Sequence, residues 1–239
     1  AGIMVASPSL RRELERRGFQ HLLPWTRGVD TALFHPSRRD AARLALYSNE
    51  THRAVPKFLF VGRVAVEKNI ETFLTAPLKG EKIVVGDGPA LTELQARFPQ
   101  ARFVGKLTGN ALAEQYAAAD VFVFPSLTDT FGIVMLEAMA SGVPVAAFDV
   151  TGPCDVVTPG VSGELAHDQS ALGLAQAAHK ALQLDRTMVR TAAMQFSWQS
   201  CAVMFLSNVL KAHKAAGWPV DTALFPADAR DLANTERSV

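Results

Sequence analysis

The sequence has little that would mark a metal-binding, disulfide-stabilised, membrane-spanning or nucleic-acid-binding protein. Its two cysteines and six histidines show no spacing typical of metal ligands. The formal net charge of the 239 residues is only +1, which gives no electrostatic argument for nucleic acid or another broadly anionic partner. No apolar run approaches the roughly 20 residues needed to cross a membrane.

The first residues and the cysteines favour a cytoplasmic location. The start, AGIMVASPS, lacks the charged region and long apolar region of a signal peptide. Cys154 and Cys201 lie in helix-like segments, where we expect reduced thiols within the core. A short predicted helix, Ser9–Gly18 with Ser9 as its N-cap, carries four arginines. We expect these to form a solvated face rather than a contact with acidic lipid.

Alternating strands and helices predict the fold. Short runs rich in Val, Phe and Ile alternate with segments of helical spacing. The predicted strands are 58–61, 82–85, 101–104, 121–125 and 143–148, and the helices that follow them are 69–76, 90–98, 111–119, 133–141 and a short one near Cys154. This alternation predicts an α/β protein with a doubly wound, Rossmann-like parallel sheet. Its strand-to-helix loops open at one edge, where ligands bind.

Further elements are predicted on either side of this region. Residues 40–47 are expected to form a helix, and residues 161–166 a final edge strand. The segment 169–184 predicts an amphipathic helix. Its inward residues are expected to be Leu172, Ala175, Ala178, Ala181 and Leu182. A long helix is predicted to follow Ser197 as N-cap and to reach about His213, and the tail from Gly217 is expected to be weakly ordered.

The loop after the first of these strands carries two cations. Gly62 lets the backbone turn close to a ligand, and Arg63 and Lys68 lie beside the start of the next helix. Two cations at a helix N-terminus suit a pyrophosphate. The alternative is that both pair with Glu67 and Asp87 as ordinary surface ions.

The loops after the second and third predicted strands would contact a ligand mainly through backbone groups rather than through charged side chains. Gly86–Pro89 is a tight turn that keeps side chains out of the cleft. It is not a dinucleotide fingerprint, because Leu91 occupies the position of the third glycine. The loop Gly105–Thr108, with Lys106 and Leu107, suits contact with the edge of a base, although a plain surface turn explains it equally well.

The loop before helix 133–141 combines a glycine with two acids. Gly132 ends a polar loop at a helix N-terminus, which is an anion-binding geometry. Glu137 lies one turn into an otherwise apolar helix, and its carboxylate points back toward the loop. A lone Glu there would support the helix dipole or cap a backbone N–H. Because Asp129 lies eight residues earlier, two carboxylates converge, and a functional role becomes the better interpretation.

This stretch resembles a signature of retaining glycosyltransferases of the large group 1 (family 4) type, which have the GT-B fold. Asp129-x7-Glu137, followed by Ala-Met-Ala-Ser-Gly-Val-Pro-Val, is similar to the E-x7-E motif, with an Asp one methylene shorter in place of the first Glu. Gly-Arg-x4-Lys, Gly-Asp-Gly-Pro and Phe-x-Gly extend the resemblance over roughly residues 58–168. The chain would then hold the C-terminal, donor-binding half of that fold.

The resemblance implies a role for each candidate residue. Arg63 and Lys68 would bind the donor diphosphate, Glu137 the ribose hydroxyls and Asp129 the donor sugar. The expected donor-binding residues are Gly62, Arg63, Lys68, Gly86, Lys106, Leu107, Phe131, Gly132, Ile133 and Glu137, and the expected catalytic residues are Asp129, Arg63 and Lys68. No metal or other cofactor is expected, since the chain has no Asp-x-Asp pair and its own cations face the phosphate.

The resemblance also predicts organisation and function. Residues 1–37 would be the remnant of an N-terminal domain with the interdomain crossing, 38–212 the nucleotide-sugar-binding domain and 213–239 a tail. The predicted reaction is retaining transfer of a hexose from a UDP- or GDP-linked donor to a sugar or lipid-linked acceptor. The absence of an acid from loop 106–110 favours uridine. The alternatives are a nucleotide-sugar 2-epimerase of the same fold, and a donor-binding module that is inactive without the missing domain.

Overall fold

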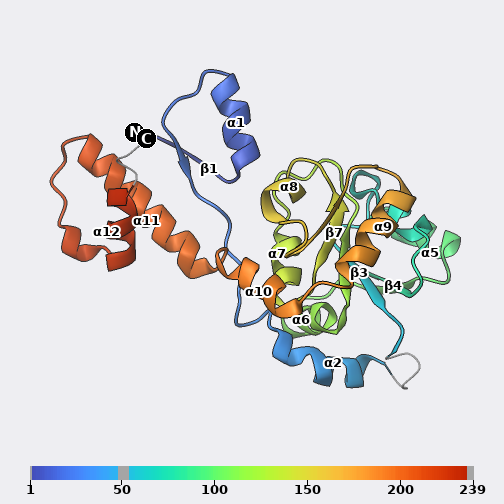
Figure 1. The fold of residues 1–239 in the computed structure, drawn as a ribbon. Coiled ribbons are helices and arrows are strands. Elements are labelled where there is room, and N and C mark those ends of the chain that lie inside the picture. The colour runs from blue at the N-terminus through green and yellow to red at the C-terminus, as the bar shows by residue number, and fades with distance from the viewer. Residues whose placement is uncertain (1, 48–53, 236–239) are drawn as a thin grey trace. The chain divides into compact units, whose positions relative to one another are not determined.

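The computed structural model describes residues 2–47 and 54–235, which belong to two compact units. Val29–Met194 form the larger unit, and Ala1–Gly28 together with Gln195–Val239 form the smaller one, so that both ends of the chain contribute to the same unit (Figure 1). The prediction of three functional segments with boundaries near residues 37 and 212 concerns the whole protein and stays a prediction.

The larger unit is built on a six-stranded parallel sheet in the order β5-β4-β3-β6-β7-β8. The strands are β3 (Lys57–Val61), β4 (Glu81–Val85), β5 (Arg102–Gly105), β6 (Val121–Phe124), β7 (Val145–Phe148) and β8 (Gly163–Ala166). The chain moves outward from β3 to β5 and then returns to the other side of β3, so the order reverses between β3 and β6. The predicted doubly wound, Rossmann-like α/β sheet is confirmed.

Helices cover both faces of this sheet (Figure 1). They are α2 (Arg39–Leu46), α4 (Ile70–Thr75), α5 (Leu91–Arg97), α6 (Gly109–Ala118), α7 (Ile133–Ala140), α8 (Pro153–Val156), α9 (Ala171–Ala181) and α10 (Arg186–Met194), with short 3-10 turns η1 (Pro36–Arg38) and η2 (Val66–Lys68). Phe58 and Phe60 pack on the face covered by α4, α5 and α9. Phe122 contacts Tyr116 of α6 on the other face. This alternation along each strand positions the helices that carry the candidate residues.

Most predicted elements are present with ends shifted by one to a few residues, and the predicted inward face of α9 is confirmed except at Leu172. Leu172 is 56% exposed, so its predicted inward position is wrong. Ala175, Ala178 and Ala181 are buried as predicted, and Leu182 is partly buried against the core. Leu174, which was not predicted, packs in the core in place of Leu172.

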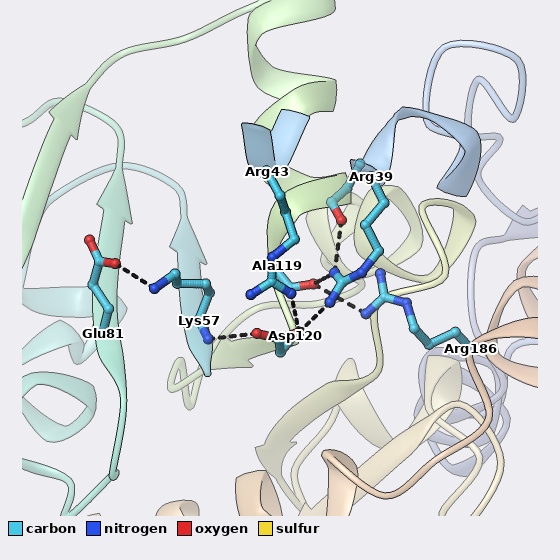
Figure 2. A network of polar contacts seen from close by, with 8 residues as sticks. Arg39, Arg43, Lys57, Glu81, Ala119, Asp120 and Arg186 are labelled. Atoms are coloured by element: carbon cyan, nitrogen blue, oxygen red, sulfur yellow. Dashed lines mark hydrogen bonds and ion pairs between the residues drawn. The ribbon is translucent and has the colours of Figure 1, made fainter. Parts of the chain in front are cut away.

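A network of ion pairs lies at the edge of the sheet where the strands begin (Figure 2). Asp120 precedes β6 and accepts hydrogen bonds from Arg39, Arg43 (3.0 Å) and the backbone N–H of Lys57 (2.8 Å). Arg186 of α10 donates to the carbonyl of Ala119 at 3.1 Å, beside the same cluster. The network therefore ties α2 and α10 to the central strands, on the edge opposite the strand-to-helix loops.

The smaller unit contains β1 (Ile3–Val5), α1 (Pro8–Arg16), β2 (Leu22–Pro24), α11 (Trp198–Ala215), η3 (Thr222–Leu224) and α12 (Ala227–Thr235). The N-cap of α1 is Ser7 rather than Ser9, because Pro8 occupies the first helical position and the Ser7 hydroxyl accepts from the N–H of Leu10 at 3.3 Å. Ser197 caps α11 as predicted, with its hydroxyl 3.0 Å from the N–H of Ser200.

Two expectations about the smaller unit and the cysteines are wrong. The tail after Gly217 is not structureless, because α12 packs on α11 with Ala229 buried and Lys214 3.0 Å from Asn234. Cys154 is exposed on the single turn α8, and only Cys201 is a buried thiol. Within residues 2–47 and 54–235, no helix is long and apolar enough to cross a bilayer.

Candidate functional site

The loops that follow β3 and β6 meet where the strand order reverses. Lys68 Nζ lies 2.7 Å from Asp129 Oδ1, although the two residues are 61 positions apart in the chain. Their side chains are only 26% and 23% exposed. In open α/β sheets the crevice at such a reversal is the usual ligand site. A cation from an early loop and an acid from a late loop therefore share one place at the edge of the sheet.

Asn69 fixes the position of Lys68. It adopts a left-handed conformation with φ of 52°, which asparagine tolerates better than most side chains. Its amide donates to the carbonyl of Pro125 at 3.0 Å, and its oxygen accepts from the Thr72 hydroxyl at 2.7 Å. The loop after β3 is thus bonded to the end of β6. Asn69 was not predicted as a site residue, because a single asparagine between a cation and a helix carries no distinctive pattern.

One carboxylate oxygen of Asp129 has no hydrogen-bond partner among the described residues. Its Oδ1 pairs with Lys68, whereas its Oδ2 is buried and has no hydrogen-bond partner among the described residues. Gly152, after β7, approaches the same loop so closely that a Cβ there would lie 2.3 Å from the Asp129 carbonyl oxygen. An unsatisfied buried carboxylate oxygen is uncommon, and it leaves the Asp129 carboxylate with unused capacity to accept hydrogen bonds.

The Arg63 side chain is more exposed to solvent than that of Lys68. Its guanidinium is 3.3 Å from Glu67, and its side chain is 65% exposed. The surface-ion alternative thus describes Arg63, but not Lys68, whose partner is Asp129 rather than Glu67 or Asp87. Because an exposed ion pair of this kind contributes little, a phosphate can replace Glu67 as the partner of Arg63 at small cost.

A cavity of about 420 Å³ opens beside Arg63, within the size range of small-molecule sites. It is lined by Val61, Gly62, Arg63, Val85, Gly86, Asp87, Gly88, Lys106 and Leu107. The structure therefore brings Gly62, Arg63, Gly86, Lys106 and Leu107 together from three loops. Gly86 has φ of +147°, and a Cβ there would lie 1.8 Å from the carbonyl oxygen of Gly62. Only glycine allows these two loops to touch.

The helix α7 supplies the remaining candidates. Gly132 is its N-cap in a left-handed conformation, with φ of 76° and no side-chain cap. The first N–H groups of α7 can therefore receive an anion at the loop mouth. Ile133 is half-exposed at this start, whereas Phe131 is buried. The backbone around Phe131, Gly132 and Ile133 lies in the same loop as Asp129.

Glu137 is partly buried on α7 and is bonded from within the domain. Its Oε2 accepts a hydrogen bond from the Tyr116 hydroxyl at 2.8 Å. Burial raises the pKa of the Glu137 carboxyl above its usual value, and the hydrogen bond from Tyr116 opposes that rise. Tyr116 was not predicted as a site residue, because it lies among alanines on α6, where a large buried side chain indicates packing rather than a functional role. In the described part of the chain, no group of three or more His, Cys, Asp or Glu side chains could hold a metal ion.

Comparison with known proteins gives a family match. Residues 55–184 match the model of the family described as glycosyl transferases group 1. The chain is 39% identical over 157 residues to a GDP-mannose-dependent alpha-mannosyltransferase of Corynebacterium glutamicum, which covers 64% of this chain and 37% of that protein. It is 40% identical over 164 residues to the protein of the same description from Mycolicibacterium smegmatis, which covers 68% and 43%. The chain thus spans about two fifths of the length of these relatives.

Solved structures of similar fold cover most of this chain. A sucrose-phosphate synthase from Thermosynechococcus elongatus superposes with a TM-score of 0.75 at 29% identity, over 89% of this chain and 58% of that one. The Anabaena protein HepE, solved in complex with UDP, gives a TM-score of 0.71 at 20% identity, over 90% and 64%. At that identity, the second likeness supports the fold alone.

Proposed function

Because the chain belongs to the glycosyl transferases group 1 family, we propose that the loop edge of its sheet binds a nucleotide sugar, whose hexose the whole protein transfers to an acceptor with retention of configuration. The observation that carries this proposal is the meeting of Lys68 and Asp129 where the strand order reverses. A cation for a phosphate and an acid for a sugar are needed side by side in such a site.

The diphosphate is the part of the donor that needs most charge. Breaking the sugar–phosphate bond leaves negative charge on the departing phosphate, and groups already aimed at that charge lower the barrier. Arg63 and Lys68 supply two cations, and the N-terminus of α7 at Gly132 supplies backbone N–H groups. On this proposal the protein's own groups meet the phosphate charge, and no cofactor takes part.

The remaining candidate residues would bind the nucleoside and the sugar of the donor. Glu137 would accept hydrogen bonds from the ribose hydroxyls, and the cavity lined by Gly86, Lys106 and Leu107 would hold the base. Asp129 would orient the hexose through its partly exposed carboxylate. Retention of configuration would follow if the donor phosphate assisted deprotonation of the acceptor on the face that the phosphate leaves.

The relatives and the loop after β5 favour different donor nucleotides. Two relatives at 39% and 40% identity are GDP-mannose-dependent, which favours GDP-mannose, whereas the absence of an acid from loop 106–110 favours uridine. The acceptor, a sugar or lipid-linked sugar, would be bound by an N-terminal domain, of which residues 1–37 would be the remnant. A cytoplasmic location stays a prediction from the cysteine content.

A donor-binding module without turnover is the second candidate. The chain spans only 37% and 43% of the two mannosyltransferases, and transfer in this family would need the missing acceptor side. We therefore expect the 239-residue chain to bind a nucleoside diphosphate and to transfer little sugar by itself. Efficient transfer by this chain to an added acceptor would contradict the module hypothesis.

The phosphate assignment predicts that Arg63→Ala and Lys68→Ala each weaken binding of UDP or GDP by about tenfold or more, since each removes a charge-assisted hydrogen bond. Isothermal titration calorimetry with both nucleotides measures this. The control is Arg97→Ala, which removes an exposed arginine paired with Glu71 and Glu93. Unchanged affinity in both site variants would refute the assignment.

The ion pair predicts an opposite effect for Asp129→Asn. This change removes the carboxylate that neutralises Lys68, so a nucleoside diphosphate without sugar should bind about three- to tenfold more tightly. The additional affinity conferred by an attached sugar should fall, because the neutral amide oxygen is a weaker acceptor for the sugar hydroxyls than the carboxylate. Asp129→Glu keeps the charge and serves as the matched control. Weaker binding of the plain diphosphate by the asparagine variant would count against a competition between phosphate and Asp129.

A further inference from the structure

The buried tyrosine beneath Glu137 is placed to control that carboxylate. Helices α6 and α7 both begin at the loop edge of the sheet, and Tyr116 lies two turns into α6, whereas Glu137 lies one turn into α7. Tyr116 is fully buried, and its hydroxyl meets Glu137 Oε2 at 2.8 Å. Since side chains lean toward the start of a helix, the hydroxyl reaches Glu137 from the interior and not from the ligand side.

The ring of Tyr116 is held on two sides. Phe34 meets it edge-on, with the ring centres 5.6 Å apart and the planes at 86°, and Phe122 of β6 contacts it at 5.7 Å. Phe34 is fixed in turn, because Arg190 of α10 donates to the carbonyls of Phe34 and Thr31, both at 3.1 Å. The hydroxyl therefore has little freedom to leave Glu137.

We propose that Tyr116 is a positioning residue for Glu137, whose hydroxyl holds one carboxylate oxygen so that the other faces the two ribose hydroxyls of the nucleotide. This inference rests on the proposed function, which assigns the ribose to Glu137. A carboxylate has about four sites that accept hydrogen bonds, and Tyr116 occupies one of them from below. The carboxylate is then oriented before the nucleotide arrives, and binding costs less side-chain entropy.

The hydrogen bond also keeps Glu137 in its accepting form. Burial and the neighbouring Glu137 raise the pKa of Tyr116 well above its usual value, so Tyr116 stays protonated and always donates. Burial raises the pKa of Glu137, and the bond from Tyr116 is the influence that lowers it. From α10, which also packs on α7, Arg190 is bound to backbone carbonyls, including that of Ala140.

The test compares nucleotides with and without ribose hydroxyls. Dissociation constants of GDP and 2′,3′-dideoxy-GDP, and of the corresponding uridine pair, are measured by calorimetry for the 239-residue chain. We expect Tyr116→Phe to reduce the preference for the ribonucleotide by about fivefold or more, and to leave the dideoxynucleotide affinity unchanged. If the substitution only lowered the stability of the fold, the affinities for the ribonucleotide and the dideoxynucleotide would fall by the same factor.

The chain offers a matched control for this change. Tyr47 is its other tyrosine, also buried but placed beside Lys57 and Arg102, away from the loop edge. Tyr47→Phe should leave the ribose preference as it is in the parent chain. Equal ribose preference in the parent and Tyr116→Phe chains would overturn the inference.

A second variant separates this inference from the proposed function. Glu137→Ala should abolish the ribose preference; if it does not, or if the parent chain shows none, then Glu137 does not bind ribose and both proposals fail. If Glu137→Ala abolishes the preference and Tyr116→Phe leaves it intact, only the role of Tyr116 fails. Without nucleotide, carbon-13 NMR of the Glu137 carboxyl should show a higher pKa in Tyr116→Phe than in the parent chain, and an unchanged pKa would also overturn the inference.

Discussion

Asp120→Asn should lower the free energy of unfolding by about 3 kcal/mol, because it removes the carboxylate that mostly buried arginines share. Arg39 and Arg43 both bond to Asp120, and the side chains of all three are between 16% and 22% exposed. Arg186 adds a third guanidinium beside them, and burial, followed by the nearby charge of Arg39, lowers its pKa to about 10 (Figure 2). The side-chain amide introduced by Asp120→Asn can still accept hydrogen bonds from the arginines, but it cannot balance their positive charge.

Urea unfolding followed by circular dichroism measures this loss. Arg97→Ala is a suitable control, because it breaks an exposed network with Glu71 and Glu93 and should leave the unfolding midpoint nearly unchanged. Since Asp120 lies at the edge opposite the loops, nucleotide affinity of the folded variant should be unaffected. An asparagine variant as stable as the parent chain would mean that the arginines are satisfied without the carboxylate.

Gly86→Ala should damage both stability and nucleotide binding. A Cβ at this position would lie 1.8 Å from the carbonyl oxygen of Gly62, which no side-chain rotation can relieve. The first two loops must separate, at a cost of about 3 kcal/mol from strain and overpacking. Because both loops line the cavity beside Arg63, affinity for UDP or GDP should fall by about tenfold or more.

A second glycine distinguishes steric overlap from backbone strain. Gly160 also has positive φ, +76°, but a Cβ there would meet no atom within 4 Å. Gly160→Ala should therefore cost only about 1 kcal/mol and leave nucleotide binding intact. Thermal unfolding and calorimetry of the two variants provide the comparison. Similar losses in both would show that the contact between the first two loops matters little.

Local signals were sufficient to predict most of the sheet and its helices. The helix predicted at 133–141 is found at Ile133–Ala140, because Gly132 and Gly142 bound an apolar run on both sides. The tail shows where such signals fail. Pro226 and several charges indicated weak order, whereas α12 is stabilised by packing Ala229 against α11, which is a tertiary effect.

The same distinction applies to the candidate site. A parallel sheet places every strand-to-helix loop at one edge, so the approach of Lys68 to Asp129 could be anticipated from topology. The bond between Tyr116 and Glu137 could not, because it depends on how α6 packs beside α7. Asn69 was missed for a related reason, since its role follows from a positive φ and a bond to Pro125.

The strand order also determines when the site can assemble during synthesis. Lys68 leaves the ribosome 61 residues ahead of Asp129, which at about 5–20 residues per second is an interval of roughly 3–12 seconds. For most of that interval β3 lacks its neighbour β6, and the nascent chain holds Arg63 and Lys68 without Asp129 opposite them. The complete donor site, with an acid for the sugar beside the cations, therefore forms only after the central pair of strands has closed, and a bound nucleotide sugar can stabilise the domain only from then on.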